Sequence, residues 1–277
     1  MQEKQNIRRD HISVSVRARL ALCIAATLAF TVGIGASARA SIIVNGDFEG
    51  GTTGGVPNGW SFDDNGDTNA TVAVDSGTVG ESAFTSGSQS ARLSNDTDND
   101  GSAGSQSFNQ SFDPVSGQLQ YVFDFYLDDS TPNDTHWNAQ LRGDGNTNQA
   151  FAYNIDHHGY TEPAGQFTLI ARGGNDAQEI VLDAQAWYRV TTNLDTDTQT
   201  FSGTLENTGG LVTTITSKTF QQTVNAFDLA RFTDGGAGDD GSPINIDNVS
   251  LIPEPSSLLL LGLGAVTMLN WRKRRRL

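Results

Sequence analysis

The chain has 277 residues, with 32 acidic and 17 basic side chains, 30 glycines and one cysteine. Eleven of the basic residues lie in the first forty and the last six positions, which leaves six basic against 29 acidic residues in the segment 41–252. The resulting net charge of −23 in this segment repels phosphate backbones and excludes nucleic acid as a partner. The same charge keeps the segment soluble and attracts cations.

The first forty residues have the composition of an export signal. A basic region ends at Arg19, an apolar stretch follows over residues 20–34, and Ala38 and Ala40 supply the small side chains that signal peptidase requires. We therefore predict a signal peptide over residues 1–40, with signal peptidase cleaving after Ala40. The single cysteine is removed with it, so the mature domain is held by its own core without disulfides.

The C-terminal end contains three parts in order. Pro253, Glu254 and Pro255 come first, an apolar stretch follows over residues 256–271, and a basic cluster occupies residues 272–276. The apolar stretch alone fits either a short transmembrane helix or a buried helix. The basic tail favours the transmembrane helix, because cations at a helix end are retained on the cytoplasmic side.

This three-part arrangement resembles the PEP-CTERM sorting signal of Gram-negative bacteria that make exopolysaccharide. The resemblance covers residues 253–277. It implies that an exosortase reads the Pro-Glu-Pro motif and removes the helix that holds the protein in the inner membrane. The processed protein would then be released or attached at the cell surface or in the extracellular matrix.

Between the terminal segments, apolar residues recur at every second position, as in strands with one buried face. Residues 118–127 show this alternation most clearly, and segments 187–192 and 198–205 flank a turn-forming gap that predicts a hairpin. Further strands are predicted at 71–74, 90–94, 150–155, 166–171, 179–182 and 211–219. We predict one all-β domain over residues 41–252, an antiparallel jelly-roll β-sandwich flanked by an N-terminal signal helix and a C-terminal transmembrane helix.

The last predicted strand contains a change of phase. Ile244 and Ile246 share one face of this strand, whereas Val249 and Leu251 lie one residue out of phase with them. A β-bulge near Asp247 would return both pairs to the core and re-aim the Asp247 side chain.

The two ends of the domain look matched. Segment 42–60 contains the run Asn-Gly-Asp-Phe-Glu followed by Gly-Trp, and segment 246–251 closes the domain. Together they are similar to the opening and closing strands of galactose-binding-like jelly rolls, which include many carbohydrate-binding modules. The 187–205 hairpin and the length of the domain are more similar to concanavalin A/laminin G-like sandwiches. Both families are jelly rolls, so the architecture is the same while the binding face differs.

The sharpest polar motif is an acidic run in which Asp96, Asp98 and Asp100 alternate before Gly101. Carboxylates with this spacing can surround one hard cation such as calcium as the chain turns. An EF-hand is excluded, because its twelfth position holds Ser107 rather than glutamate and no helices flank the run. Two interpretations stay open, a calcium site and a solvated acidic turn.

The resemblance to carbohydrate-binding jelly rolls implies an alternative metal site. Such domains often hold a structural calcium where the first and last strands meet, and the ligands in this chain would be Asp47, Glu49 and Asp247. The competing interpretation is that Glu49 and Asp247 cap strand ends. Calcium is the only cofactor that the sequence predicts.

Aromatic side chains matter for sugar recognition, because ring faces stack on the apolar faces of pyranose rings. Trp137 and Tyr160 lie among polar, loop-like neighbours, and we predict that they form a ligand-binding platform. Trp60 has similar neighbours, but packing in the core is the favoured interpretation for it.

No catalytic signature is found in the sequence. Acidic residues are too frequent for a specific pair to be chosen, and neither a Gly-x-Ser-x-Gly elbow nor a His-Glu-x-x-His helix is present. Asp156, His157 and His158 are adjacent, and a surface loop is the favoured interpretation for them. We therefore predict no catalytic residues and a protein that is not an enzyme.

Three functional hypotheses remain for the folded domain. The first is a non-catalytic module that binds extracellular polysaccharide, with calcium as a candidate cofactor. The second is a structural matrix protein whose acidic surface bridges divalent cations. The third, the least favoured, is a polysaccharide hydrolase or lyase on the same fold.

Overall fold

The computed structural model describes residues 41–63, 71–75, 82, 84, 87–94, 106–127, 135–157, 165–174, 176–234 and 243–254. The predicted signal peptide, the apolar C-terminal segment, the Asp96 loop and Tyr160 lie outside these residues. Within the described ranges, no helix is long and apolar enough to cross a membrane.

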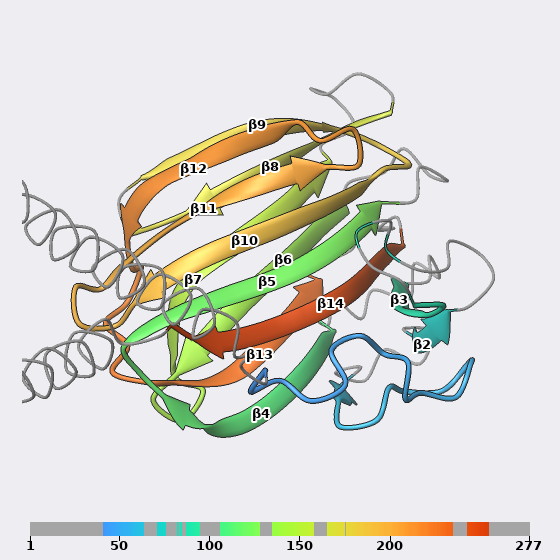
Figure 1. The fold of residues 1–277 in the computed structure, drawn as a ribbon, viewed down its shortest axis with the longest axis horizontal. Coiled ribbons are helices and arrows are strands. Elements are labelled where there is room, and N and C mark those ends of the chain that lie inside the picture. Colours follow the sequence, from blue (N-terminus) through green and yellow to red (C-terminus); the bar gives the residue numbers. More distant parts are fainter. Residues whose placement is uncertain are drawn as a thin grey trace, which may run out of the picture. The chain divides into compact units, whose positions relative to one another are not determined.

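Fourteen β-strands within the described ranges form two seven-stranded sheets (Figure 1). Sheet 1 contains, in spatial order, β12 (Val212–Thr219), β11 (Thr200–Asn207), β10 (Trp187–Asp195), β5 (Gln118–Leu127), β14 (Ile244–Pro253), β3 (Ser90–Ser94) and β2 (Thr71–Asp75). Sheet 2 contains β1 (Ser61–Asp63), β4 (Ser107–Val115), β13 (Phe227–Asp234), β6 (Thr135–Gly143), β7 (Asn148–His157), β8 (Gln166–Arg172) and β9 (Ala177–Asp183).

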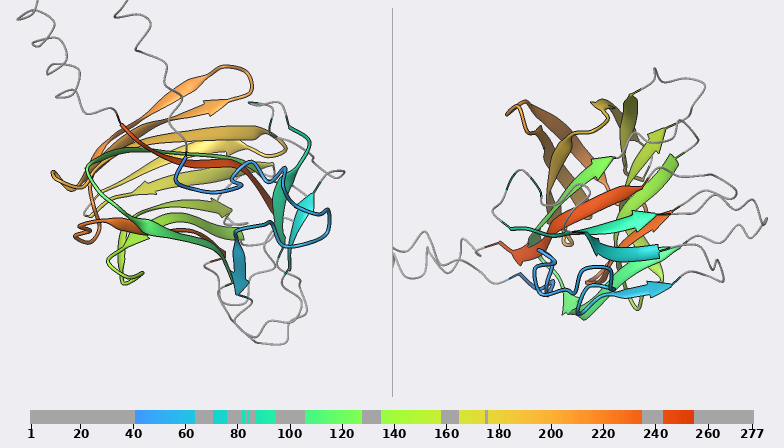
Figure 2. Two further views of the ribbon diagram at one scale, coloured as in Figure 1. Left: turned by 60° about the horizontal axis from the view of Figure 1, so that its bottom comes forward. Right: turned by 90° about the vertical axis from the view of Figure 1, so that its right-hand side faces the viewer.

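Every strand pair within the two sheets is antiparallel. Strands that are distant in sequence lie side by side, because β14 pairs with both β5 and β3, and β13 pairs with both β4 and β6. Figure 2 shows the two sheets as stacked layers. The prediction of an all-β antiparallel sandwich is therefore confirmed.

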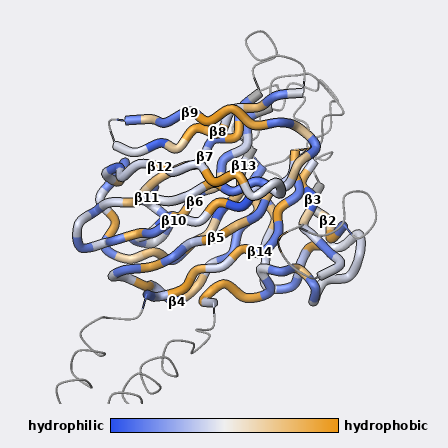
Figure 3. The backbone as a smooth tube through the Cα atoms, turned by 45° about the horizontal axis from the view of Figure 1, so that its top comes forward, coloured by the Kyte–Doolittle hydropathy of each residue, from blue (hydrophilic) through white to orange (hydrophobic). Residues whose placement is uncertain are grey.

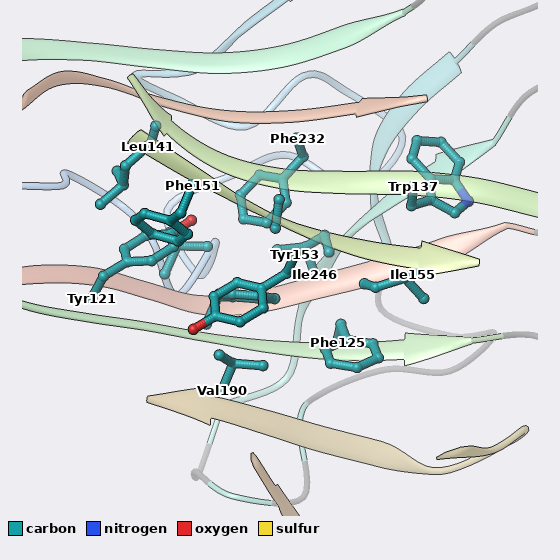
Figure 4. Packing of buried hydrophobic residues seen from close by; sticks show 14 of the residues in the cluster. Tyr121, Phe125, Trp137, Leu141, Phe151, Tyr153, Ile155, Val190, Phe232 and Ile246 are labelled. Carbon is teal, nitrogen blue, oxygen red and sulfur yellow. The ribbon is translucent and has the colours of Figure 1, made fainter. Parts of the chain in front are cut away.

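Aromatic rings from both sheets fill the space between the layers. Phe123 of β5 lies 5.9 Å from Tyr153 and 5.6 Å from Phe232, measured between ring centroids, and both partners belong to sheet 2. Phe151 of β7 stacks on Phe201 of β11 at 4.9 Å. One polar contact crosses the same space, where the Tyr153 hydroxyl lies 2.8 Å from Thr192 Oγ1. These contacts define one continuous core (Figure 4).

The alternation of apolar and polar residues explains the clearest strands. Along β5 the odd-numbered residues from Leu119 to Leu127 are all fully buried, and hydrophilic and hydrophobic segments alternate along the strands (Figure 3). The predicted hairpin is present as β10 and β11, with Asp195 paired to Thr200 at the turn. The Asp195 carboxylate accepts hydrogen bonds from the backbone N–H groups of Asp197 and Thr198, which fixes that turn.

The two ends of the domain meet as expected. The Ile42 N–H donates to the Leu251 carbonyl at 2.8 Å, and the Val249 N–H donates to the Gly46 carbonyl at 2.8 Å. The predicted bulge in β14 is confirmed, because the register with β5 shifts between Asp247 and Ser250. As a result Val249 and Leu251 return to the core, where they are 2% and 0% exposed.

Four strands were not predicted from the sequence: β1, β4, β6 and β13. Their outward side chains are rich in Asn, Gln, Ser and Asp, which are typical of turns. Three of these strands, β4, β13 and β6, are neighbours in the middle of sheet 2, and they support the outer face that is described next.

Candidate functional site

The outer face of sheet 2 is built by the alternation of β6. Trp137, Ala139 and Leu141 point into the core, so the intervening side chains point outward. We name this outer surface the polar face and define it by the side chains of Asn109, His136, Asn138, Gln140, Arg142, Asn154, Asp156, Arg172 and Arg231. Several of these are almost inaccessible although they lie on the outside of a sheet, including Asn138 at 9%, Gln140 at 7% and Asn154 at 3% exposure.

One row of hydrogen-bonded side chains crosses β6, β7 and β8 on the polar face, with the Asn154 amide at its centre. Asn138 on β6 pairs in register with Asn154 on β7. In the amide orientation that satisfies its neighbours, Asn154 donates to Asn138 Oδ1 (2.6 Å) and accepts from Arg172 Nε (2.9 Å) and Nη2 (3.2 Å). This chain of bonds fixes the exposed Arg172 guanidinium above β8.

A histidine and a carboxylate lie together one pair further along the same strands. His136 and Asp156 are opposite each other in register, and His136 Nδ1 lies 2.6 Å from Asp156 Oδ1. Asp156 is 1% exposed, whereas the His136 side chain is 26% exposed. The expectation that Asp156 lies in a surface loop is wrong, because β7 continues through it and the β6 partner covers its carboxylate.

Two arginines lie beside Gln140 on the polar face. Arg231 of β13 is opposite Gln140 of β6, and Arg142 follows two residues further along β6. Gln140 Oε1, Arg142 Nε, Arg231 Nε and Asn109 Oδ1 are buried atoms with no hydrogen-bond partner among the described residues. Buried polar atoms are normally paired, so these open donors and acceptors need hydrogen-bond partners from outside the described residues.

The two arginines also affect each other electrostatically. Burial and the neighbouring Arg142 guanidinium lower the pKa of Arg231, and Asp63 on β1 acts in the opposite direction. Like charges are rarely held side by side in a protein without a compensating group. The two guanidinium groups therefore repel each other, and the Asp63 carboxylate offsets part of that repulsion.

An open depression adjoins the polar face at β8 and β9. Its volume is about 480 Å³. Its lining includes the charged side chains of Arg172, Asp176 and Glu179, together with Gly173 and Gln221. Arg172 is thus shared by the hydrogen-bonded row and the depression.

The predicted aromatic platform is not formed by Trp137. Its side chain is 2% exposed and lies in the core cluster together with Ile155 and Phe232 (Figure 4). Trp137 alternates with the outward His136 and Asn138 along β6, so its ring faces the other sheet and cannot stack on a sugar. The prediction for Trp137 is therefore wrong, and the side chains that define the polar face include no Phe, Tyr or Trp.

The alternative calcium site is not assembled either. Asp47 is exposed, Glu49 accepts hydrogen bonds from Ser88 Oγ (2.9 Å) and the Gln89 N–H (2.8 Å), and Asp247 is 2% exposed. No group of three or more His, Cys, Asp or Glu side chains within the described ranges is arranged to hold a metal ion. Asp96, Asp98 and Asp100 lie outside those ranges.

Asp247 instead belongs to a buried network on the outer side of sheet 1. Arg189 binds Asp124 through two bonds, Nε to Oδ1 at 2.7 Å and Nη2 to Oδ2 at 2.8 Å. Ser82 donates from Oγ to Asp124 (2.6 Å) and from its N–H to Asp247 (3.0 Å). Asn248 donates from Nδ2 to Asp124 at 2.7 Å. This network joins three strands to Ser82 and is structural.

The residues of the polar face could have been found from two signals in the sequence. His136, Asn138, Gln140 and Arg142 alternate with apolar residues in a period of two. Basic residues are also rare, with only six in segment 41–252, and Arg142, Arg172 and Arg231 of this face are three of them. Neither signal shows which strands are neighbours, and this pairing is what brings the residues together.

Comparisons with known proteins agree with this fold. Residues 251–276 match the family profile described as PEP-CTERM protein-sorting motif, and no curated protein matches the chain in a sequence comparison. The catalytic domain of a glycoside hydrolase family 131 protein from Coprinopsis cinerea is 11% identical, with a TM-score of 0.50 over 78% of this chain and 96% of that one.

Two further solved structures match with lower TM-scores. The lectin UEA-II in complex with galactose is 8% identical, with a TM-score of 0.43 over 70% of this chain and 97% of that one. A sialidase is 14% identical, with a TM-score of 0.44 over 66% of this chain, and the match spans only 17% of that longer protein. At these identities the likeness concerns the fold alone.

The fold and the motif together give the class of the protein. The two antiparallel sheets form the described domain, and the matched motif begins within its last strand. The chain is an all-β jelly-roll sandwich protein that carries a PEP-CTERM sorting motif, which indicates an exported protein held transiently in the membrane.

Proposed function

We propose that this chain is an exosortase substrate whose β-sandwich binds polysaccharide without catalysis, through the polar face. Signal peptidase would cleave after Ala40, the C-terminal helix would hold the protein in the inner membrane, and exosortase would act at Pro253, Glu254 and Pro255. The processed domain would then lie at the cell surface or in the extracellular matrix of a Gram-negative bacterium.

The open acceptor of Gln140 is the observation that carries the binding proposal. Its side chain is 7% exposed, and Oε1 has no partner among the described residues. Leaving a buried amide oxygen unpaired costs about 1–3 kcal/mol, and a ligand hydroxyl would remove that cost. Asn109 Oδ1 offers a second open acceptor one strand beyond Arg231.

Rigidity supports the same proposal. The polar face is carried by strands in the middle of sheet 2, and Asn138, Asn154 and Arg172 hold each other in place. A preorganised array of amides and guanidinium groups loses little side-chain entropy when it binds sugar hydroxyls. Recognition here rests on hydrogen bonds.

Affinity electrophoresis tests the proposal directly. The full chain, purified in non-ionic detergent, would be run through gels that contain the host exopolysaccharide or one of a panel of purified glycans. Retardation on at least one gel is the expected result. Migration that matches the polymer-free gel on every polymer would count against polysaccharide binding and favour a structural matrix protein.

A matched pair of variants locates the binding surface. Gln140→Leu should reduce the retardation, because it removes the open acceptor at nearly constant volume. Gln120→Leu makes the same substitution on the outer side of sheet 1, where Gln120 donates to Asn193 at 3.3 Å. This control variant should leave the retardation unchanged. Equal losses in both variants would show that the polar face is not the binding surface.

Calcium is proposed as a supporting ion through Asp96, Asp98 and Asp100. Carboxylates in that spacing suit a hard cation. Each gel would therefore be run with calcium and again with chelator. Retardation that disappears with chelator would support the ion, and Asp98→Asn should then have the same effect as the chelator.

An enzyme is the second candidate, because His136 and Asp156 lie 2.6 Å apart on the polar face. Such a pair could transfer a proton to or from a bound sugar. New reducing ends or unsaturated products released from a retained polysaccharide would support this function, and their loss in His136→Gln would assign it to the pair. Retention without products would support the non-catalytic module.

A further inference from the structure

The few cations of the acidic domain divide into two groups. Arg189 is bound to Asp124, and Lys218 Nζ lies 2.7 Å from Asp176. Arg92 donates to Asn245 at 2.9 Å. The other three basic residues of segment 41–252 are Arg142, Arg172 and Arg231, and all of them lie on the polar face.

No carboxylate within the described ranges forms a salt bridge with these three arginines. The domain has 29 acidic residues, so acidic partners are abundant elsewhere. A guanidinium group that is partly buried is normally paired with a carboxylate or a similar anion. The polar face thus gathers three of the six basic side chains without a salt-bridge partner among the described residues, and Asp63 on β1 offsets the charge of Arg231 only at longer range.

Arg142 and Arg231 are close enough to act on one ligand group. Arg231 is opposite Gln140, and Arg142 lies two positions along the same strand face. Both guanidinium groups have a buried Nε without a partner among the described residues. The Nε and Nη groups of an arginine form a fork that matches the two oxygens of a carboxylate or sulfate.

We propose that the polar face selects an acidic polysaccharide, with Arg142 and Arg231 binding the oxyanion of a sugar acid locally, against the general repulsion of polyanions by the net charge of −23 in segment 41–252. This inference rests on the proposed polysaccharide binding and names its ligand class. Gln140 and Asn109, the open acceptors beside the two arginines, bind hydroxyl groups of the same sugar. Arg172, in register with Gln140 across Ala152 of β7, binds a second acidic unit of the chain.

Carboxylated and sulfated sugars offer the same pair of acceptor oxygens. The experiment therefore compares the host exopolysaccharide, polygalacturonate and alginate with their carboxyl-reduced forms, and dextran sulfate with dextran. The full chain in non-ionic detergent is run on affinity gels against each polymer. Stronger retention of the acidic member of a pair is the expected result, and the pair that shows it identifies the oxyanion.

Variants assign the selectivity to the two arginines. Arg142→Gln and Arg231→Gln should each weaken binding of the acidic polymer by about tenfold, which corresponds to a loss of about 1.4 kcal/mol, because each removes charged hydrogen bonds to the oxyanion. Leu211→Glu changes the net charge by the same amount at a side chain that is 67% exposed beyond β11, and it should leave binding unchanged.

Two conservative variants keep the test decisive if the Arg→Gln variants fail to fold. Arg142→Lys and Arg231→Lys keep the charge but lose the fork, and they should give intermediate retention in a protein that unfolds at the wild-type temperature. A Lys variant as tight as wild type would overturn bidentate recognition.

The outcomes separate this inference from the proposed function. Equal retention of acidic polymers and their neutral forms, unchanged in both Arg→Gln variants, would overturn the selectivity but keep polysaccharide binding. Retention of no polymer would remove both. Loss of retention in Leu211→Glu as well would assign the effect to net charge and overturn the role of the two arginines.

Discussion

Asp247 and Asp124 lie opposite each other on the adjacent strands β14 and β5, and both side chains are buried. Arg189 binds Asp124 through two hydrogen bonds, whereas the Asp247 oxygens accept only backbone N–H groups among the described residues, those of Ser82 and Asn248. One cation therefore serves two facing carboxyl groups. The bulge that returns Val249 to the core also places Asp247 in this position.

This arrangement predicts an unusual pH dependence of stability. Burial raises the pKa of Asp247 to about 7, Asp124 and Glu49 add to the rise, and the two N–H donors oppose it. The unfolded carboxyl titrates near pH 4, so between pH 4 and 7 the folded chain keeps a proton that the unfolded chain has lost. The contribution of Asp247 to the free energy of unfolding should thus fall by up to about 4 kcal/mol as pH rises through this window.

Urea unfolding of the wild type and Asp247→Asn at several pH values measures this effect. Asn cannot ionise, so the difference between the two proteins should shift in favour of the variant as pH rises from 4 to 8. Contributions from other titrating groups cancel in that difference. A difference that stays constant over this range would show that Asp247 titrates normally in the folded protein.

A second prediction compares two cations whose acidic partners differ in burial. Arg189→Met leaves Asp124 buried and unpaired, and we expect a loss of about 3 kcal/mol in the free energy of unfolding. Lys218 has a side chain that is 1% exposed, but its partner Asp176 is 71% exposed. Lys218→Met therefore removes a buried charge and leaves the solvated Asp176 carboxylate. The free energy of unfolding should change by less than about 1 kcal/mol. Equal costs measured by urea unfolding would contradict this distinction.

The sequence was most informative where burial has a simple period. The odd-numbered residues of β5 are all apolar, so the strand and its inner face could be predicted, as could the bulge that corrects the phase of β14. The even-numbered side of β5 was less informative. Asp124 looks like an ordinary outward residue in the alternation, but Arg189, Ser82 and Asn248 cover it completely.

The candidate site was much less predictable, because it depends on which strands become neighbours. Arg142 and Arg231 are far apart in the sequence, and only the pairing of β6 with β13 brings them together. Trp137 was wrongly assigned to the site for a related reason. Its polar neighbours suggested an exposed loop, whereas a strand places adjacent residues on opposite faces, so polar neighbours are what a core residue of β6 requires.

Trp137 should therefore act on stability rather than on binding. Trp137→Ala should lower the free energy of unfolding by about 3–5 kcal/mol, because it leaves a cavity between the sheets. Trp137→Phe keeps most of the packing and should remain folded, with the wild-type retardation on polysaccharide gels. A folded Trp137→Phe protein that loses retardation would restore the role in sugar binding that its buried position argues against.

The sorting motif begins inside the folded domain, which predicts an effect on processing. Pro253 pairs with Leu119 at the end of β14, and the Glu254 N–H donates to the Gln118 carbonyl at 2.8 Å. If exosortase reads Pro-Glu-Pro, these two residues must first leave β5. Breaking one such hydrogen bond costs about 1 kcal/mol, so the free form of the motif is a minor fraction.

A flexible insertion should therefore speed processing. Six Gly and Ser residues between Ile252 and Pro253 would leave the Ile252–Gln120 pair in place while freeing the motif, and processing should become about fivefold faster. The rate is measured by pulse-chase immunoblotting of the precursor and the processed form in the host. The same insertion after Asn207, in the turn that joins β11 to β12, serves as the control and should have no effect. A rate that is unchanged, or slower, would mean that exosortase reads the motif while it is still attached to β5.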